Sequence, residues 1–486
     1  MSAPKPSGPT PPRRPPARPS SAPSPASVAA ASVATALDGA GDTIVAMATP
    51  AGRSAIAIVR LSGAHALEVA GAVLVPWPIT VRQARRLSAR DPRTGELLDR
   101  PVVTVYAAPD SFTGDDVVEI ATHGGVVAPA GVVAALVAAG ARPARAGEFT
   151  RRAVLHGKID LAQAEAIADL IDARSGAMRR SALEQLDGGL SRRVAALREA
   201  VLGVEALLAY DIDFPEEDDG PISRDRIAGA AAGAAAAIER VGAGAAVGEL
   251  VREGAVVVIA GPPNAGKSSL FNALLGRARA LVTDVPGTTR DAIEAVLDPI
   301  DRDAPYPLRI VDTAGLRETT DVVERLGIEV SERYLRGAHV VLACGETVDA
   351  VTDTAQRVTA LSDATVLRVR TKSDLGLRAD DAGVLAVSAE TGDGIPALLE
   401  GIYAAVGAVV AYDPDVPAVL RERHRQALGR AAAELARFRE ALVTEIPATI
   451  AAVHLRAAVG ALDELIGVVR TDDVLDRVFA DFCIGK

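Results

Sequence analysis

Residues 261–268 have the types and spacing needed to hold the phosphates of a nucleotide. They read G-P-P-N-A-G-K-S and fit the pattern G-x4-G-K-[ST]. In such a loop, backbone N–H groups at a helix N-terminus surround the phosphates, Lys267 neutralises the β- and γ-phosphate oxygens, and the Ser268 hydroxyl binds Mg²⁺. An apolar run at 256–260 precedes the loop, and a helical pattern through Leu270 follows it. This order of strand, loop and helix indicates a nucleotide site.

Three further motifs follow the phosphate loop in the order and spacing of a Ras-like GTPase. Residues 312–315 read D-T-A-G after an apolar run at 308–311, and the aspartate of such a motif senses Mg²⁺ and the γ-phosphate. Residues 371–374 read T-K-S-D, and Ser388 and Ala389 follow another apolar run. The four motifs together predict a Ras-like P-loop GTPase domain.

The choice of guanine rests on Asp374. A carboxylate there can accept two hydrogen bonds from guanine, one from N1–H and one from the exocyclic amine, and adenine does not offer this pair. The usual motif begins with Asn, whereas this chain has Thr371. The shorter side chain predicts weaker nucleotide binding with unchanged base choice.

The residues expected to act on the attacking water are unusual. Ras carries a water-positioning Gln directly after the D-x-x-G glycine, and this chain has Leu316, which cannot hydrogen-bond water. Glu324, on the helix expected after the motif, is a candidate for that role. From the residues alone, a solvated charge on the helix surface is the other interpretation.

The composition limits the remaining function classes. The formal net charge of −11 argues against a general nucleic-acid coat, and 3% aromatic residues argue against a base-stacking platform. The two cysteines, Cys344 and Cys483, cannot form a disulfide framework and fit a reducing compartment. Cys344 ends an apolar run and is expected in a core, and the histidines lack zinc-ligand spacing.

The length of 486 residues and the changes of sequence pattern along the chain predict a multidomain α/β protein. The first 41 residues are a Pro- and Ala-rich tail expected to be disordered. Short apolar runs, including 102–106 and 117–121, predict an α+β domain at 42–156. Helical periodicity at 157–250 and 407–486 predicts one helical domain in two halves, which flank the inserted G domain at 251–406.

Two helical faces can be read from the periodicity. In the first half of the helical domain, the periodicity predicts one apolar face, and Asp160, Glu165 and Asp172 lie outside that face. That face comprises Ile159, Ala162, Ile167, Leu170 and Ile171. The face expected in the second half comprises Leu420, His424, Leu428, Ala432, Leu435, Phe438 and Leu442.

Two stretches resemble membrane signals. Residues 124–141 carry no charge, but Gly, Ala and Pro129 favour a buried helix of a soluble domain over a membrane span. Arg13 and Arg14, followed by the small-residue run 26–37, have the outline of an export signal. The surrounding prolines favour a disordered tail, so a cytoplasmic protein with no membrane partner is expected.

The chain resembles the MnmE (TrmE) family of tRNA-modification GTPases from residue 42 to its end. The motifs that carry the resemblance are 42–46 (DTIVA), 111–116 (SFTGDD), 160–166 (DLAQAEA), 287–291 (GTTRD), 312–317 (DTAGLR) and 482–486 (FCIGK). Ribosome-assembly GTPases share the GTTRD-type segment but lack the terminal pentapeptide and the split helical domain. The resemblance also implies that the N-terminal domain binds tetrahydrofolate and forms a homodimer.

The family resemblance implies a function with partners. Together with the flavoprotein MnmG, the protein would add an aminomethyl or carboxymethylaminomethyl group to carbon five of the wobble uridine of certain tRNAs. A 5-formyl- or methylene-tetrahydrofolate derivative would supply the one-carbon unit, and GTP hydrolysis would drive the conformational cycle. The resemblance places the folate contacts on Arg60, Glu119, Lys158 and Lys486. For Cys483, a nucleophilic role and a small buried residue both remain open.

The resemblance also assigns the GTP site. Mg²⁺ falls to Ser268 and Thr289, K⁺ to Asn264, Thr283, Val285 and Thr288, and Glu324 matches the family's catalytic glutamate. The GTP contacts it implies are Asn264, Ala265, Gly266, Lys267, Ser268, Ser269, Thr283, Asp284, Val285, Pro286, Gly287, Thr288, Thr289, Asp312, Thr313, Ala314, Gly315, Lys372, Asp374, Ser388 and Ala389.

Three other functions stay open at this point. They are a ribosome-assembly or RNA-binding regulatory GTPase without base chemistry, a folate-dependent aminomethyl transferase with a regulatory G domain, and a nucleotide-gated scaffold without turnover. Folate binding would exclude the first, and GTP turnover would exclude the scaffold. Methyl transfer without MnmG or tRNA would favour the transferase.

Overall fold

The structure is a computed structural model, and its described residues form two compact units. The described residues are 41–173, 175–213, 222–276, 279–281, 293–298, 306–312, 334–375, 383–409, 421–444 and 446–467, with positions 475, 478, 479, 482 and 485. One unit holds the described residues up to Phe149 together with Gly485, and the other is Thr150–Phe482. The division falls within helix α4 (Glu148–Leu155), before the domain boundary expected at residue 156.

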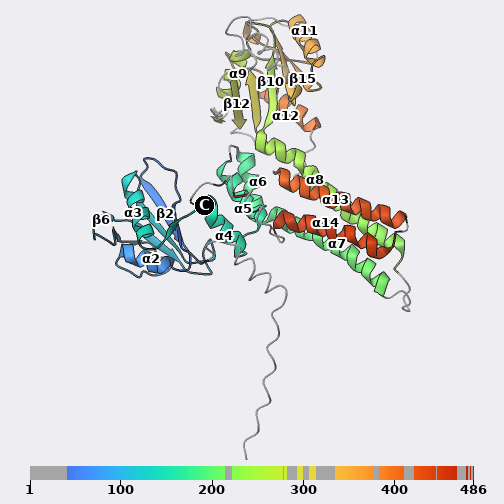
Figure 1. The fold of residues 1–486 in the computed structure, drawn as a ribbon. Helices are drawn as coiled ribbons and strands as arrows, with labels where there is room; N and C mark the ends of the chain where they lie inside the picture. Colours follow the sequence, from blue (N-terminus) through green and yellow to red (C-terminus); the bar gives the residue numbers. More distant parts are fainter. Residues whose placement is uncertain are drawn as a thin grey trace, which may run out of the picture. The chain divides into compact units, whose positions relative to one another are not determined.

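The first unit is built on a six-stranded sheet covered by two helices (Figure 1). The sheet order is β4-β7-β8-β2-β1-β9, with β9 parallel to β1 and the other pairs antiparallel. The strands are β1 Ile44–Met47, β2 Ile56–Ser62, β4 Arg85–Arg86, β7 Val102–Tyr106, β8 Val117–His123 and β9 Arg142–Pro143. A small sheet of β3 (Leu74–Val75), β5 (Ser88–Arg90) and β6 (Leu97–Asp99) adjoins helices α2 (Ala66–Val73) and α3 (Val127–Ala138).

The two faces of this sheet follow from the alternation of side chains along each strand. Val59 and Leu61 in β2 are fully buried in the core with α2 and α3. Arg60 lies between them and therefore points to the opposite face. The uncharged stretch 124–141 supplies α3, which buries Val132 and Leu136 as expected of a helix in a folded domain.

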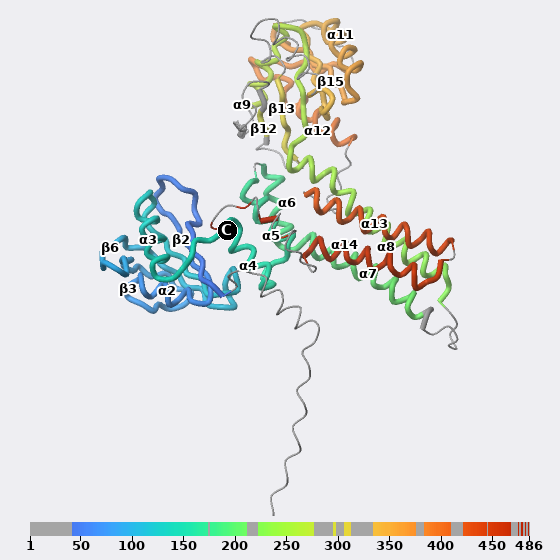
Figure 2. The backbone as a smooth tube through the Cα atoms, viewed as in Figure 1, coloured from blue at the N-terminus to red at the C-terminus, as the bar shows by residue number. Residues whose placement is uncertain are grey.

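The helical part of the second unit centres on four long helices (Figure 2). Helices α13 and α14 pack against each other, α14 packs on α7, and α13 packs on α8. The helices of this part are α5 Leu161–Ile171, α6 Gly176–Leu186, α7 Gly189–Asp213, α8 Arg224–Glu253, α13 Glu422–Val443 and α14 Ala448–Ile466. Segments on both sides of the nucleotide motifs therefore share one apolar core.

The expectation that Glu165 lies off the buried face of its helix is wrong. Glu165 is only 2% exposed, whereas Ile171, expected on the apolar face, is 46% exposed. The physical reason is that α5 packs against α6, α7 and α14, so its buried arc is wider than one apolar stripe. The expectation for His424 is confirmed, because its side chain is fully buried.

The nucleotide motifs lie on a seven-stranded sheet of order β11-β12-β13-β10-β14-β15-β16. Strands β10, β13, β14, β15 and β16 are parallel, and β11 and β12 are antiparallel additions at one edge. The strands are β10 Ala255–Ala260, β11 Arg279–Leu281, β12 Ile293–Asp298, β13 Leu308–Asp312, β14 Val340–Gly345, β15 Thr365–Arg370 and β16 Val384–Ala386.

Helices cover both faces of this sheet because its central strands are apolar on both sides. In β10, Val257 and Ile259 join the core beneath α9 (Lys267–Gly276) and α12 (Ile395–Val409). Val256 and Val258 join the core on the side of α11 (Val348–Thr359). This doubly wound arrangement is the mixed α/β fold expected for the domain.

One helix in the described part of the chain, α8, is long and apolar enough to cross a bilayer by length and composition alone. Core helices of soluble proteins pass the same test. Here Ile227 and Ile238 of α8 are each 1% exposed, and the helix packs on α7 and α13. Its apolar residues therefore serve the helical core.

Candidate functional site

The phosphate loop connects β10 to α9 through backbone conformations that favour its sequence. A Cβ at Gly261 would lie 2.5 Å from the carbonyl oxygen of Cys344, so only glycine fits against β14. Asn264 has φ of 64° and Gly266 has φ of 74°, in the left-handed region that glycine and asparagine tolerate best. Helix α9 then begins at Lys267, so its N-terminal N–H groups face the loop.

The loop brings together the groups expected to meet phosphate and Mg²⁺. The Lys267 ammonium donates to the carbonyl oxygens of Gly261 and Pro262, at 3.0 and 2.8 Å. The Ser268 hydroxyl donates to Oδ2 of Asp312 at 2.8 Å, because β10 and β13 are paired in parallel. A hydroxyl and a carboxylate are hard oxygen ligands of the kind Mg²⁺ prefers, so these residues fit the metal.

Asp374 is held in place by a second loop. It lies in a short 3-10 turn, Ser373–Leu375, and its Oδ1 accepts a hydrogen bond from the Ser388 hydroxyl at 2.6 Å. Ser388 is fully buried, and its hydroxyl also accepts from the Thr391 N–H at 3.1 Å. The motif at 371–374 and the motif that begins at Ser388 therefore meet through one hydrogen bond.

Thr371 braces the base-binding loop despite its short side chain. Its hydroxyl lies 2.7 Å from the carbonyl oxygen of Ala265 in the phosphate loop and 3.2 Å from that of Gly345 at the end of β14. The residue is only 4% exposed. The hydroxyl thus links the guanine motif to the phosphate loop, a role the sequence did not suggest for a threonine.

Replacing Thr371 with Val should weaken binding of both GDP and GTP by about 1–2 kcal/mol, because a buried carbonyl loses its donor. Thr371→Ser keeps the hydroxyl and should bind nearly as the unmodified protein does. Titration of the three proteins with a fluorescent GDP analogue measures the difference. Equal affinities for the Val and Ser variants would show that the hydroxyl does not hold the loop.

Cys344 serves the core behind the phosphate loop. It is fully buried in β14, as the sequence predicted. Burial raises the pKa of its thiol to about 12, although nearby Lys267 opposes the shift. A thiol with this pKa stays protonated at neutral pH and is a poor nucleophile.

Several expected site residues lie outside the described residues. They include most of the expected switch residues, the catalytic glutamate and two residues of the terminal motif. These are Thr283, Asp284, Val285, Pro286, Gly287, Thr288, Thr289, Thr313, Ala314, Gly315, Glu324, Cys483 and Lys486. Their assigned roles remain predictions.

In the first unit, two of the expected folate residues face each other. Arg60 in β2 lies directly opposite Glu119 in β8, and its Nε and Nη2 atoms donate to Oε1 of Glu119 at 3.1 and 2.8 Å. The rings of Phe112 and Phe149 lie 5.8 and 5.7 Å from the guanidinium. The pair is partly buried in an aromatic setting that strengthens charge interactions.

Gly485 of the terminal motif reaches the same place. Its carbonyl oxygen accepts a hydrogen bond from Nη1 of Arg60 at 3.4 Å. Its φ is 97°, and a Cβ would lie 2.3 Å from the carbonyl oxygen of Met47. Only glycine can pass so close to β1, which accounts for the residue at this position. Lys158 belongs to the second unit and is exposed after α4.

The first unit also contains an apolar cavity of about 690 Å³, between α3 and the edge of the sheet at β1 and β9. Its wall includes Val45, Ala46 and Met47 of β1 and Pro143 of β9. Val126, Pro129 and other residues around α3 complete the wall. The volume lies in the range that holds a small organic molecule.

The doubly wound sheet, the phosphate loop and the braced Asp374 define a guanine-nucleotide-binding P-loop hydrolase. The model of the MnmE helical domain matches residues 161–483, and that of the GTP-binding protein TrmE N-terminus matches 43–158. The chain belongs to the MnmE family, and it is a GTP-hydrolysing enzyme.

Relatives match the chain along nearly all of its length. It is 45% identical to the tRNA modification GTPase MnmE of Methylorubrum populi, over 92% of this chain and 98% of the relative. It is 43% identical to the proteins of that name from Acidiphilium cryptum and Yersinia pseudotuberculosis, over 92% of this chain and 99% of each relative. The crystal structure of Aquifex aeolicus Era has a TM-score of 0.24 and 23% identity over 37% of this chain and 66% of that one, and so distant a likeness carries no conclusion about this chain.

Proposed function

We propose that the protein uses GTP hydrolysis to modify the wobble uridine of certain tRNAs. With the flavoprotein MnmG, it would add an aminomethyl or carboxymethylaminomethyl group to carbon five of that base. The observation that carries the proposal is the 45% identity, over 92% of the chain, to a protein named tRNA modification GTPase MnmE. We further propose a cytoplasmic homodimer formed through the N-terminal domain, with no membrane partner.

The first unit is the proposed site of a tetrahydrofolate derivative, of the 5-formyl or methylene type. Both hydrogen bonds from Arg60 to Glu119 end on Oε1, which leaves Oε2 to accept from the donor edge of a pterin ring. Lys158 and Lys486 would supply cations for the glutamate tail.

The chemistry of hydrolysis is proposed to rest on positioning and charge. Lys267 and the N-terminus of α9 would hold the phosphates, and Asp374 the base. Ser268 and Thr289 would hold Mg²⁺, which would supply positive charge to offset that of the β- and γ-phosphates. K⁺ would be held by Asn264, Thr283, Val285 and Thr288, and Glu324 would orient the attacking water.

Deleting the gene tests the central proposal. Nucleosides from bulk tRNA, analysed by mass spectrometry, should lose the aminomethyl-type wobble uridines and regain them when the gene is restored on a plasmid. The expected result follows because this protein is proposed to bind the donor of the one-carbon unit. A nucleoside profile unchanged by the deletion would remove tRNA modification from the function of this protein.

Removing residues 482–486 should impair tRNA modification and leave GTP binding intact. The reason is that Gly485 contacts Arg60 and Met47 in the first unit, far along the chain from the nucleotide loop. A tag fused after Lys486 should have the same effect, and a tag before Met1 is the matched control. Full modification activity in the C-terminally tagged protein would argue that the terminal motif is not part of the folate site.

A further inference from the structure

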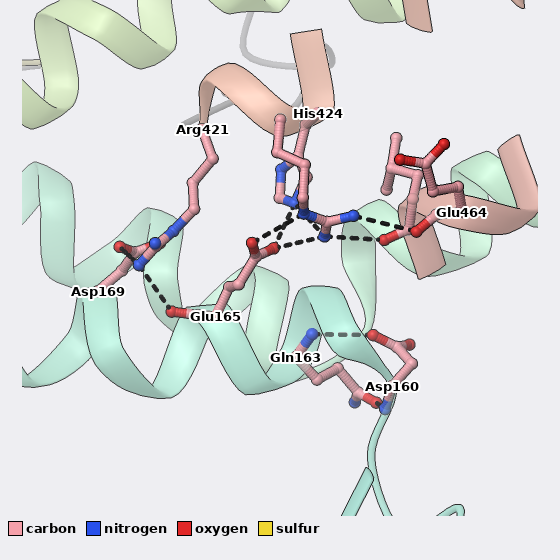
Figure 3. Close-up of polar contacts among 9 residues, drawn as sticks. Asp160, Gln163, Glu165, Asp169, Arg421, His424 and Glu464 are labelled. Carbon is pink, nitrogen blue, oxygen red and sulfur yellow. Dashed lines mark hydrogen bonds and ion pairs between the residues drawn. The ribbon is translucent and has the colours of Figure 1, made fainter. Parts of the chain in front are cut away.

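A buried cluster of charged side chains lies where α5 meets the start of α13 (Figure 3). Glu165 is 2% exposed, and His424 is fully buried. Neither residue belongs to the nucleotide site or to the proposed folate site. Burial is costly for a carboxylate unless it is paired, so the cluster needs an account of its own.

Glu165 is the centre of the cluster. Its Oε1 accepts from Nε of Arg423 at 3.0 Å, and its Oε2 accepts from Nη2 of Arg423 at 2.7 Å. Nε2 of His424 lies 2.6 Å from the same Oε2. Burial alone would raise the pKa of Glu165, but His424 and Arg423 hold it well below its usual range. The carboxylate is therefore ionised and fully engaged.

The same arginine joins a third helix to the cluster. Arg423 also donates to the carbonyl oxygens of Glu464 and Leu465, both at 3.0 Å, in the last turn of α14. Carbonyls in the last turn of a helix lack the regular helical donors, so a cation there helps to satisfy them and suits the negative end of the helix dipole. One guanidinium thus ties α5, α13 and α14 together.

A second ion pair fixes the residue that precedes α13. Arg421 donates to Asp169 of α5 at 2.7 and 3.3 Å, and to the backbone carbonyl oxygen of Glu165 at 3.4 Å. Basic residues at the start of a helix oppose its dipole, so local helix preference does not explain Arg421 and Arg423 there. The ion pairs with Asp169 and Glu165 on α5 explain the two arginines at these positions.

The position of this cluster along the chain gives it significance. Helix α13 is the first described element after α12, the last helix of the nucleotide domain. Helix α5 begins at Leu161, three residues after Lys158, and Asp160 and Gln163 form a capping box at its start. The cluster therefore connects two helices. One is α13, which follows the nucleotide domain in the chain, and the other is α5, which follows the proposed folate residue Lys158.

The cluster favours two discrete states over gradual movement. A small shift of the start of α13 would break several short, charge-assisted hydrogen bonds together and leave Glu165 buried without a partner. A junction of that kind is either engaged or released as a unit. A displacement of α13 by the nucleotide domain would therefore be transmitted to α5.

We propose that Glu165 is a positioning residue that couples the nucleotide state of the G domain to tRNA modification, by holding the start of α13 against α5 through Arg423 and His424. This inference rests on the proposed function for its final readout. It concerns residues that contact neither GTP nor the proposed one-carbon donor.

The test compares Glu165→Gln with Arg430→Gln. Arg430 makes an exposed ion pair with the carboxylate of Glu464 between α13 and α14. Its loss removes a charge pair from the same helices and leaves the hydrogen bond from Arg423 to the backbone carbonyl of Glu464 in place. Three quantities are measured on the full-length chain. They are the GTP hydrolysis rate, hydrogen exchange of the α5 amides with GDP and with a non-hydrolysable GTP analogue, and the wobble nucleosides of tRNA from cells expressing each variant.

In the unmodified protein and in Arg430→Gln, exchange in α5 should differ between the two nucleotides, and modification should be normal. Glu165→Gln should keep GTP hydrolysis within about twofold, lose the nucleotide-dependent difference, and lower modification by about tenfold or more. Arg423→Lys keeps the positive charge without the two parallel hydrogen bonds of the guanidinium, so its loss of coupling and of modification should be intermediate. If Glu165→Gln does not fold, Arg423→Lys takes its place in the test.

Three results would overturn the proposal. The first is nucleotide-independent exchange in α5 of the unmodified protein, and the second is unchanged exchange and modification in Glu165→Gln. The third is a parallel loss of GTP hydrolysis and modification in a folded variant, which would make the cluster a general structural element. If the unmodified protein leaves tRNA unmodified, the proposed function fails, and the exchange experiment still tests the coupling by itself.

Discussion

Asp374→Asn should lower the affinity for GTP and GDP by about 2–4 kcal/mol, which is about 30- to 1,000-fold. In the unmodified protein the carboxylate can accept two hydrogen bonds from the guanine edge. The Ser388 hydroxyl donates to Oδ1 at 2.6 Å and fixes the orientation of the group. In the variant, the amide oxygen would keep the bond from Ser388, and the NH₂ group would then face donors on the base.

The same geometry provides a positive control for this prediction. Xanthine has a carbonyl at the position of the guanine amine, so the new NH₂ group of the Asp374→Asn variant should donate to it. Xanthosine triphosphate should therefore bind this variant better than GTP does, and the order should be reversed in the unmodified protein. Calorimetric titration with GTP, ATP and xanthosine triphosphate measures all three affinities. Equal binding of ATP and GTP by the unmodified protein would contradict the role of Asp374.

Local signals were sufficient to predict much of the fold. The apolar runs at 102–106, 117–121, 256–260 and 308–311 all form strands, with ends displaced by at most two residues. Central strands of a doubly wound sheet are buried on both faces, so they leave continuous apolar runs. The phosphate loop was equally visible, because its glycines, lysine and serine act within one turn of chain.

Contacts between distant parts of the chain could not be predicted from the sequence. The burial of Glu165 depends on Arg423 and His424, which lie on the other side of the nucleotide domain. An isolated acid in a helical pattern is normally solvated, and only the fold reveals its partners. The bridge from Thr371 to Ala265 is of the same kind, because it depends on the parallel pairing of β10, β14 and β15.

The contact between two of the proposed folate residues could not be predicted from the sequence. The family resemblance named Arg60 and Glu119 separately, and in the structure they form an ion pair with each other. Antiparallel pairing of β2 and β8 places them opposite one another, a register that no short motif encodes. A ligand at this site would therefore meet a preorganised pair of charges.

Glu324→Ala should lower the GTP hydrolysis rate by about 10²- to 10³-fold with little change in nucleotide affinity. Leu316 cannot position the attacking water, and no motif places Arg290 or Arg317 as an internal arginine finger. The protein must then position water and offset charge with other groups. A carboxylate that orients or deprotonates the water, directly or through a second water, would supply the first of these functions.

We assign the second function to K⁺, which Asn264 and the segment that contains Thr283, Val285 and Thr288 would hold. The ion would supply positive charge against the negative charge that develops on the phosphates, and two G domains meeting face to face would exclude solvent from it. Na⁺ is smaller and fits a cage of several oxygens poorly, so exchanging K⁺ for Na⁺ should slow the unmodified protein. Both proteins are assayed in both salts at saturating GTP. A wild-type rate in Glu324→Ala would make Glu324 a surface charge, and an equal rate in Na⁺ would independently remove the role of K⁺.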